Sequence, residues 1–454
     1  MITSLFAHRD YLRLFTAQIS ALFGTGLTTV ALGLLAYELA GADAAAVLGL
    51  ALTIKMVVYV TVAPVVGAYA DRIPRRPFLV GLNIVRAGVV SALPFVDQIW
   101  HIYVLIAVLQ TASAAFTPTY QAVIPDILPD ERDYTRALSA AQLAATMETL
   151  LSPMLAAAAL AVISFHWLFV GTAIGFVVSA ALVVTTRIPN AGATVEGSFG
   201  ERIAVGMRIF MATPRLRGLL AFNLVIAAAG SIIMVNTVNY ARDTLGGDQA
   251  DVAKLLAANG FGTMISALAL PRILDRAGAR PVMRTGAAVL VTGLAAAVAL
   301  STAETGDWRQ IAATAIWAVI GAGTAAVLTP TGQVLRRSSH PADRPALFAA
   351  QFSLSHLAWL VTYPLTGWLT TTAGLSTTWV TLAVLATGGA VLATRLWPRD
   401  DPAELTHPHE AGTIDPARLT DAVRVNDHLY QHTHVYVIDA EHPRWPAREH
   451  APAA

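Results

Sequence analysis

Three ionisable residues interrupt long apolar runs of this sequence. Lys55 and Glu148 fall near the middle of the runs at 46–70 and 136–161, and Arg86 lies inside the run at 77–97. A charge at the centre of a bilayer costs about 2.5–3.5 kcal/mol, so such a side chain faces a wet cavity or a charged partner. Glu148 is our best candidate for a proton-coupling or substrate-charge site, because it lies near the middle of its span at a depth similar to that of Lys55. Desolvation would raise the pKa of this carboxyl, and a nearby Lys55 or Arg86 would lower it. A structural ion pair with Lys55 or Arg86 is the alternative.

The elements that must hold these residues are membrane-spanning helices. Of the 454 residues, 55% are hydrophobic and 13% are charged, whereas soluble domains average about 25% charged residues. A run of roughly 20 apolar residues spans a bilayer, and its backbone must be helical to satisfy its own polar groups. The predicted spans are 13–37, 46–70, 77–97, 101–122, 136–161, 165–186, 216–240, 252–273, 281–302, 309–330, 345–370 and 374–396.

The remaining segments divide the chain into four parts. We predict an N-terminal six-helix bundle at 1–190, a linker at 191–215, a C-terminal six-helix bundle at 216–397 and a soluble tail at 398–454. Arginine is concentrated in alternate connections. By the positive-inside rule, this places both termini and the tail in the cytoplasm, with the chain in a bacterial inner (plasma) membrane.

Short motifs recur in the two predicted bundles in the same order. The segment Asp71 to Pro77 is echoed by Asp275 to Pro281. The pairs Thr117-Pro118 and Ala137-Leu138 are echoed by Thr329-Pro330 and Ala346-Leu347, and the three offsets are 204, 212 and 209 residues. Each offset covers six spans, an even number, so the two halves have the same topology and form a parallel repeat.

Two parallel six-helix bundles resemble the major facilitator superfamily. Gly67-Ala-Tyr-Ala-Asp71-Arg72-Ile-Pro-Arg75-Arg76 is similar to its loop 2–3 signature, and residues 120–138 look like the exporter branch that includes macrolide and enterobactin effluxers. Ser152-Pro153 is similar to the antiporter signature Gly-Pro-x-x-Gly-Gly, with Ser and Ala in place of Gly. The resemblance implies an all-α integral membrane fold, no cofactor, a monomer, and proton-driven efflux of a small amphipathic compound.

The resemblance also implies roles for single residues. It implies a gate between the halves at the cytoplasmic motifs, which include Asp71, Arg72, Arg76, Asp275 and Arg276. Spans one, four, seven and ten line the cavity in the resembled fold. The candidate cavity residues are Gln18, Thr25, Thr28, Gln110, Thr111, Asn223, Asn236 and Asn239, with His356 from span eleven. The alternatives are hydroxyls that bond their own helix backbone, a packed histidine, and arginines that only anchor the helices.

The predicted tail carries seven of the twelve histidines. In a helix, His428 and His432 would share one face, with His434 two residues further on. Imidazole binds Zn, Cu and Ni, and the tail is loosely similar to the His-rich tails of nickel-resistance exporters. This gives an alternative function, export of a divalent metal with a metal-sensing tail. An ordinary docking segment with incidental histidines is a further alternative. The run 434–438 is expected to form a strand or to pack on the inner face.

Composition and missing motifs exclude other classes of protein. A net charge of +1 provides no basic field for nucleic acid. The chain has no cysteine, which excludes disulfides and thiolate metal sites. We find no Gly-rich phosphate loop, no G-x-S-x-G and no H-E-x-x-H, so neither ATP-driven transport nor an enzyme is indicated. The expected partners are a small-molecule substrate, protons and the lipid bilayer. A non-transporting membrane receptor stays as an alternative.

Overall fold

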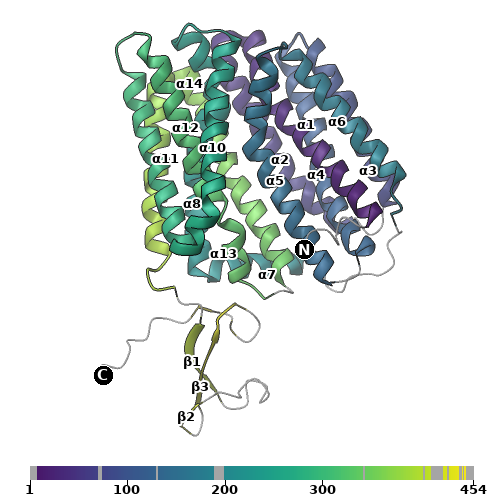
Figure 1. Cartoon of the computed structure of the whole chain (residues 1–454), viewed down its shortest axis with the longest axis vertical. Helices are drawn as coiled ribbons and strands as arrows, with labels where there is room; N and C mark the ends of the chain where they lie inside the picture. Colours follow the sequence, from purple (N-terminus) through teal and green to yellow (C-terminus); the bar gives the residue numbers. More distant parts are fainter. Residues whose placement is uncertain are drawn as a thin grey trace.

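The computed structural model describes residues 8–69, 74–128, 131–188, 199–340, 343–401, 404–410, 423–426, 429–438, 442 and 444–445. Two helical bundles stand side by side, with a small sheet below the second one (Figure 1). The N-terminal bundle consists of α1 (Arg9–Ala40), α2 (Ala44–Tyr69), α3 (Arg75–Ala92), α4 (Ile99–Ile127), α5 (Glu131–Leu160) and α6 (His166–Thr185). Short 3-10 turns η2 (Gly41–Asp43) and η3 (Leu93–Phe95) follow α1 and α3.

The C-terminal bundle begins with a composite helix. It comprises α8 (Pro214–Ser231), the π-helical segment η4 (Ile232–Asn236), α9 (Thr237–Asn239) and a second π-helical segment η5 (Tyr240–Thr244). The remaining helices are α10 (Gln249–Ala277), α11 (Ala279–Ser301), α12 (Trp308–Leu328), α13 (Thr331–Arg337) and α14 (Arg344–Leu396). Helix α14 holds two spans joined at Gly374, whose φ of 84° suits a residue without a side chain.

The described helices supply the twelve predicted spans. Nine segments of the described residues are long and apolar enough to cross a bilayer. Two of these, Arg9–Val62 and Ala346–Leu396, each contain two spans, and α5 adds a helix of 30 residues. Both α1 and the α8–η5 helix start at the end that carries the tail, here named the tail end, and finish at the opposite, distal end (Figure 1). The parallel repeat expected from the sequence is therefore confirmed.

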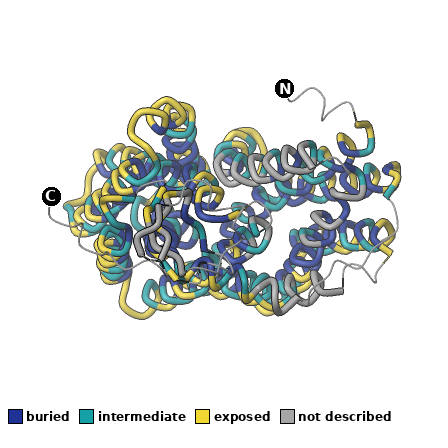
Figure 2. Tube along the Cα trace, turned by 90° about the horizontal axis from the view of Figure 1, so that it is seen from below, coloured by how far each residue is buried: buried dark blue, intermediate teal, exposed yellow. Residues whose placement is uncertain are grey.

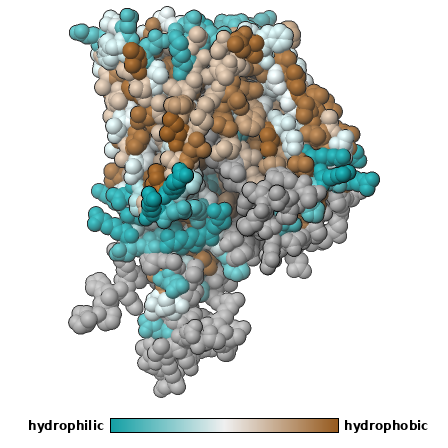
Figure 3. Space-filling view, viewed as in Figure 1, coloured by the Kyte–Doolittle hydropathy of each residue, from teal (hydrophilic) through white to brown (hydrophobic). Residues whose placement is uncertain are grey.

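A hydrophobic belt surrounds the bundles. Apolar side chains cover the middle of the visible face, and hydrophilic ones gather toward its two ends (Figure 3). Large apolar side chains are exposed along the helices, among them Ile84, Ile174, Leu268 and Val384. An exposed apolar surface of this kind marks contact with a membrane. Viewed from the tail end, buried residues lie inside each bundle and exposed ones on the outer rim (Figure 2).

Two helix pairs make the most extensive contacts between the halves, α2 with α14 and α5 with α10. Glycines allow the first pair to pack closely at the distal end. A Cβ added to Gly49 would lie 2.8 Å from the carbonyl oxygen of Tyr363 and 3.0 Å from the Cα of Gly367. In the second pair, a Cβ on Gly260 would collide with Met154. Because both contacts are made at glycines, the backbones of the two halves approach each other directly.

The linker and the tail contain structure that differs from the sequence expectations. A helix of 14 residues, α7 (Phe199–Ala212), lies within the predicted linker and packs against α14. The tail holds an antiparallel sheet of β1 (Glu404–Glu410), β2 (Val423–Asn426) and β3 (Leu429–Val435) in the order β1-β3-β2. The membrane part is all-α, as predicted, and the tail adds this small sheet. Edge strand β1 tolerates Pro408 because an edge residue needs no second strand partner.

The prediction of a helical pair at His428 and His432 is wrong. His432 and His434 lie in strand β3, which is rich in the β-branched and aromatic residues that favour strands. His428 lies outside the described residues. Tyr436 and Ile438, which follow β3, are buried against the hydrophobic core, so the run at 434–438 both ends a strand and packs on the bundle.

Candidate functional site

An aromatic stack connects the two halves below the glycine contact of α2 and α14. The ring of Tyr59 on α2 stacks on His356 of α14, with centroids 5.6 Å apart and planes 8° apart. Phe352, one turn before His356, lies 5.9 Å from the same tyrosine ring. The Nδ1 of His356 is 2.6 Å from the carbonyl oxygen of Phe352, a contact that fixes the imidazole on its helix. The predicted cavity residue His356 thus lies at the boundary between the halves.

Lys55 lies one helical turn before Tyr59 on α2, so both project from the same face of the helix. Glu148 of α5 and His356 of α14 are both within electrostatic range of Lys55. Glu148 also acts on Tyr59. The sequence-predicted Lys55 and Glu148 are therefore brought together, and we name Lys55, Tyr59, Glu148 and His356 the central cluster.

Glu148 is held against α1 by a glycine and a serine. Ser152, one turn further along α5, donates a hydrogen bond of 3.4 Å to Oε1 of Glu148. A Cβ on Gly26 of α1 would lie 2.7 Å from the same Oε1 and closer still to the Ser152 oxygen. The missing side chain of Gly26 thus makes the space in which the half-buried carboxylate sits.

Arg86 lies apart from Glu148, inside the N-terminal bundle. Its guanidinium is 4.1 Å from the ring centroid of Phe176 and 4.9 Å from that of Phe116. It donates to Oδ1 of Asn83 at 3.1 Å, and Asn83 in turn donates to Ser179 at 2.9 Å. Arg86 forms no ion pair with any described residue, and its link to the central cluster is electrostatic, through Tyr59. Cation–π contacts of this kind stabilise a buried guanidinium.

The other predicted cavity residues fall into several environments. Thr25 donates to its own helix, at the carbonyl oxygen of Ala21. Gln18, Thr28 and Gln110 each have a buried side-chain oxygen without a hydrogen-bond partner among the described residues. Thr111 lies on an outer groove of about 320 Å³ between α3 and α4, so it is not placed with the central cluster.

The three asparagines of the predicted seventh span bond within or beside the C-terminal bundle. Asn223 exchanges hydrogen bonds of 3.3 and 3.4 Å with Gln351. Asn236 donates to Thr370 at 2.9 Å and accepts from Trp379 at 3.2 Å. Both amides are therefore engaged inside their own bundle. Asn239, in contrast, lies at the boundary between the halves.

Asn239 belongs to a set of contacts at the distal end that we name the distal latch. Its amide donates to the carbonyl oxygen of Ala42 at 3.1 Å and to Asp243 at 3.0 Å. The hydroxyl of Tyr37 on α1 donates to the other oxygen of Asp243, and the guanidinium of Arg242 lies 5.6 Å from the Tyr37 ring. Gln249 adds a further hydrogen bond between the bundles at this end, which it donates to the carbonyl oxygen of Ile163 at 3.3 Å.

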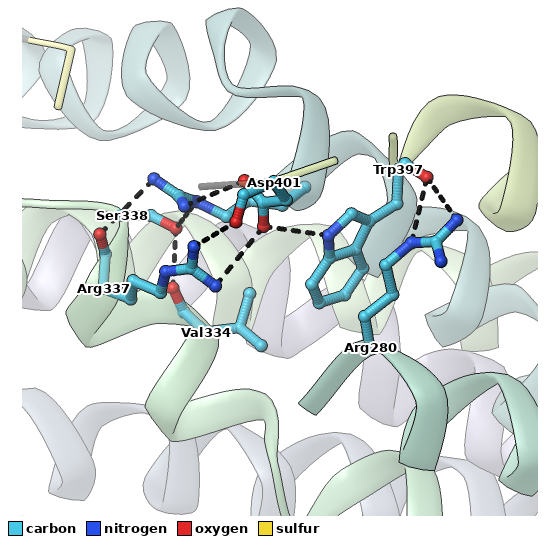
Figure 4. Close-up of polar contacts among 7 residues, drawn as sticks. Arg280, Val334, Arg337, Ser338, Trp397 and Asp401 are labelled. Atoms are coloured by element: carbon cyan, nitrogen blue, oxygen red, sulfur yellow. Dashed lines mark hydrogen bonds and ion pairs between the residues drawn. The ribbon is translucent and has the colours of Figure 1, made fainter. Parts of the chain in front are cut away.

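At the tail end, a polar junction joins the start of the tail to the C-terminal bundle (Figure 4). Arg215 is 2% exposed and pairs with Asp401 at 3.2 Å, while its Nε donates to Ser338 at 2.9 Å. Asp401 also pairs with Arg337 and accepts from the indole of Trp397 at 3.0 Å. Trp445 from the tail covers the guanidinium of Arg215 at 5.1 Å. A space of about 200 Å³ lies beside this junction.

The predicted gating residues are only partly described. Asp71 and Arg72 lie outside the described residues. Arg76 is exposed and donates to the carbonyl oxygen of Val184 within its own bundle. Asp275 and Arg276 are exposed at the end of α10. Their gating role stays a prediction.

Sequence reasoning missed several residues of these sites. Tyr59 could have been found, because it follows Lys55 by four residues on the same helix. Gly26, Tyr37 and Asp243 gave no local signal, because their partners come from distant parts of the chain. No group of three metal-ligating side chains comes together among the described side chains.

Comparison with known proteins identifies the family. The model of the Major Facilitator Superfamily matches residues 14–309 and 218–438. Macrolide efflux protein A of Streptococcus pyogenes is 24% identical over 184 residues, which is 39% of this chain and 45% of that protein. The Enterococcus faecalis protein of the same name is 25% identical over 170 residues, 36% of this chain and 52% of its own length. The matched region thus spans about half the length of these relatives.

Solved structures agree on the fold. The nucleoside transporter NupG superposes with a TM-score of 0.65 at 14% identity, over 86% of this chain and 100% of NupG. A bacterial homolog of the lysosomal transporter Spinster, in an inward-facing and unoccupied conformation, gives 0.65 at 15% identity, over 86% and 97% of the two chains. The match to the family model, which covers most of the chain, shows that the chain belongs to the Major Facilitator Superfamily, and its long apolar helices make it a multi-pass membrane protein.

Proposed function

We propose that this transporter exports a small amphipathic compound in exchange for protons, with the central cluster as its coupling and binding site. The observation that carries the proposal is the place of Glu148. It is a half-buried carboxylate at mid-span, within range of Lys55 and of the Tyr59–His356 stack that joins the halves. A group at the boundary between two moving bundles can exchange protons with each side in turn.

Two further observations support the direction of transport and the assignment of the tail end to the cytoplasmic side. The relatives that match part of this chain are named macrolide efflux proteins, which favours export. Arginine-rich connections lie at the tail end, and the positive-inside rule favours a cytoplasmic location for that end. The matched relatives are bacterial proteins, which favours a bacterial plasma membrane. On this assignment, we expect the distal latch to face the outer side and substrate to enter from the cytoplasm.

The test of coupling is Glu148→Gln in inverted membrane vesicles. With an imposed pH gradient, we expect the wild-type chain to accumulate a macrolide or a related amphipathic compound. We expect the variant to fall to the level seen without a gradient, because the side-chain amide of glutamine does not gain or lose a proton near neutral pH. Counterflow exchange of the same compound should persist if Glu148 serves coupling alone.

Glu304→Gln is the matched control, because Glu304 is an exposed carboxylate at the distal end. It should leave gradient-driven accumulation unchanged. Both variants must first elute as single species in detergent. Accumulation by Glu148→Gln that still follows the pH gradient would show that another group couples transport to protons.

A further inference from the structure

An aromatic strip follows one face of α14 where this helix meets α2. Its four members lie at positions i, i+4, i+7 and i+11, which share one side of a helix: Phe352, His356, Trp359 and Tyr363. The ring centroids of Phe352 and His356 are 4.0 Å apart, and those of Trp359 and Tyr363 are 4.9 Å apart. Gly230 of α8 makes room for the Trp359 ring, because a Cβ there would lie 2.3 Å from it. The strip is therefore held in place by its own bundle.

Tyr59 is the ring that the N-terminal bundle presents to this strip. It lies within 8° of parallel to His356 at a centroid distance of 5.6 Å, and its centroid is 5.9 Å from that of Phe352. Tyr59 and His356 are half-buried, and Phe352 is 38% exposed, so the stack is not closed off by other side chains. The two bundles thus hold ring faces toward each other across their boundary.

This stack must open when the bundles rock about the close contact at Gly49. Tyr59 lies ten residues beyond Gly49 on α2, about 15 Å along the helix axis. A tilt of about 15° would move Tyr59 by about 4 Å. One further aromatic ring needs about 3.5–4.0 Å, the optimal separation between non-bonded carbon atoms. The opened stack would therefore be wide enough for one planar ring.

We propose that the substrate carries a planar aromatic ring, which is held between Tyr59 and His356 when the stack opens. This inference rests on the proposed export function and narrows its amphipathic compound to an aromatic one. When the bundles separate, each of the two rings loses a stacking partner, and the ligand ring replaces both partners at once. Such a ligand favours the separated bundles, because only that state can hold it. Substrate binding and opening of the tail end are thereby linked.

The central cluster supplies the polar part of the same site. Lys55 lies one turn from Tyr59 on α2, and it is within electrostatic range of both Glu148 and His356. The opposite formal charges of Lys55 and Glu148 offset each other. A neutral aromatic ligand therefore tests the ring contact alone.

The experiment compares two neutral ligands with the same carbon skeleton, 2-naphthol and its saturated form decahydro-2-naphthol. Binding to the full chain in detergent is measured by equilibrium dialysis, with protein-free micelles as the blank. We expect 2-naphthol to bind about tenfold more tightly or better, because only the planar aromatic form can stack on two rings. Tyr59→Leu and His356→Leu should each remove most of this preference. Tyr59→Phe and His356→Phe should keep it, since both retain a ring.

Tyr103→Leu is the matched control, because Tyr103 is a half-buried tyrosine of α4 that lies outside the stack. It should keep the wild-type preference for 2-naphthol. Each variant is compared after it elutes as a single species in detergent. The comparison of the two ligands on the wild-type chain needs no variant, so it tests the proposal even where a substitution prevents folding.

Equal binding of the two ligands to the wild-type chain would overturn the proposal, because the site would then select by apolar volume rather than by stacking. An equal loss of preference in Tyr103→Leu and Tyr59→Leu would overturn it as well. No pH gradient is applied, so these results do not depend on coupling. If they fail while Glu148→Gln still abolishes gradient-driven accumulation, the aromatic site is wrong and the export proposal remains.

Discussion

Gly26 is the residue that allows Glu148 to lie against α1. A methyl group at this position would meet the Glu148 carboxylate and the Ser152 hydroxyl, both of which lie inside normal contact distance of the added Cβ. Close approach of a backbone to a functional group is a typical use of glycine. The proposed coupling site therefore depends on the absence of a side chain at Gly26.

We therefore expect Gly26→Ala to destabilise the N-terminal bundle by about 1–3 kcal/mol, as overpacking of a close contact does. It should also lower gradient-driven transport, because the carboxylate must move. Thermal unfolding in detergent and vesicle uptake measure the two effects. Gly33→Ala on the same helix is the matched control, since its Cβ would lie 3.4 Å from Leu48 and 3.5 Å from Val238, which are ordinary contacts. Equal behaviour of the two variants would contradict this account of Gly26.

The sequence predicted some of these residues and not others, for physical reasons. Lys55 and Glu148 stand out because charge is rare in apolar runs, and the structure brings them together. The same rule proposed Arg86 as a partner of Glu148, but Arg86 is stabilised by two phenylalanine rings. An aromatic ring does not stand out in an apolar run, so sequence alone could not choose between a carboxylate and a ring as the partner.

At the scale of elements, the distal latch depends on helix irregularities. Two π-helical segments, Ile232–Asn236 and Tyr240–Thr244, flank the short α9 that carries Asn239. A π-helical turn rotates the residues that follow it, and such turns are frequent at functional sites. Here they accompany the placement of Asn239 and Asp243 toward α1 and η2. The apolar run predicted this span but contained no signal for its irregularities.

Tyr37→Phe should loosen the distal latch, because it removes the hydroxyl that donates to Asp243. Loss of one hydrogen bond of about 1 kcal/mol would raise the outward-open population about fivefold. The chain has no cysteine of its own, so a single Gly33→Cys reporter at the boundary can be labelled with a membrane-impermeant maleimide in whole cells. We expect faster labelling when Tyr37→Phe is present.

Tyr103→Phe provides the comparison for the latch, because it removes a tyrosine hydroxyl from α4 that lies outside the latch. Labelling of the reporter should then keep its original rate. If Tyr37→Phe and Tyr103→Phe label alike, the Tyr37–Asp243 contact does not control opening.

Helix α7 and the tail strands could not be predicted from the local sequence pattern. Helix α7 lies in a polar segment without a spanning run, so hydropathy did not reveal it. The sequence did not predict a strand at the tail histidines, because two histidines four residues apart fit one face of a helix as well as one face of a strand. Only the pairing of β3 with β1, which are separated along the chain, decides between the two.

On the scale of the whole molecule, the polar junction connects the tail to the last bundle. Asp401 accepts contacts from Arg215, Arg337 and Trp397, and its side chain is 9% exposed. Removing one partner of a buried ion pair is strongly destabilising, since the remaining charge stays buried. The repeat motifs predicted the two parallel bundles, but they contained no information about this junction, because it has no counterpart in the N-terminal half.

Asp401→Ala should therefore lower the free energy of unfolding by about 3 kcal/mol, whereas the exposed neighbour Asp400→Ala should have little effect. Thermal unfolding in detergent measures both, and limited proteolysis shows whether the tail is released. Similar melting temperatures for the two variants would mean that Arg215 is satisfied without Asp401.

In the rocking motion that we propose, the contact between Gly49 and Gly367 would act as the pivot between the two bundles. Lys55 lies six residues beyond Gly49 on α2, about 9 Å along the axis, and Tyr69 lies twenty residues beyond it, about 30 Å. A tilt of about 10° around this point would shift Lys55 by about 1.6 Å and the far end of the helix by about 5 Å. Such a tilt would widen the tail end of the molecule, while Lys55, which lies close to the pivot, would keep almost the same neighbours.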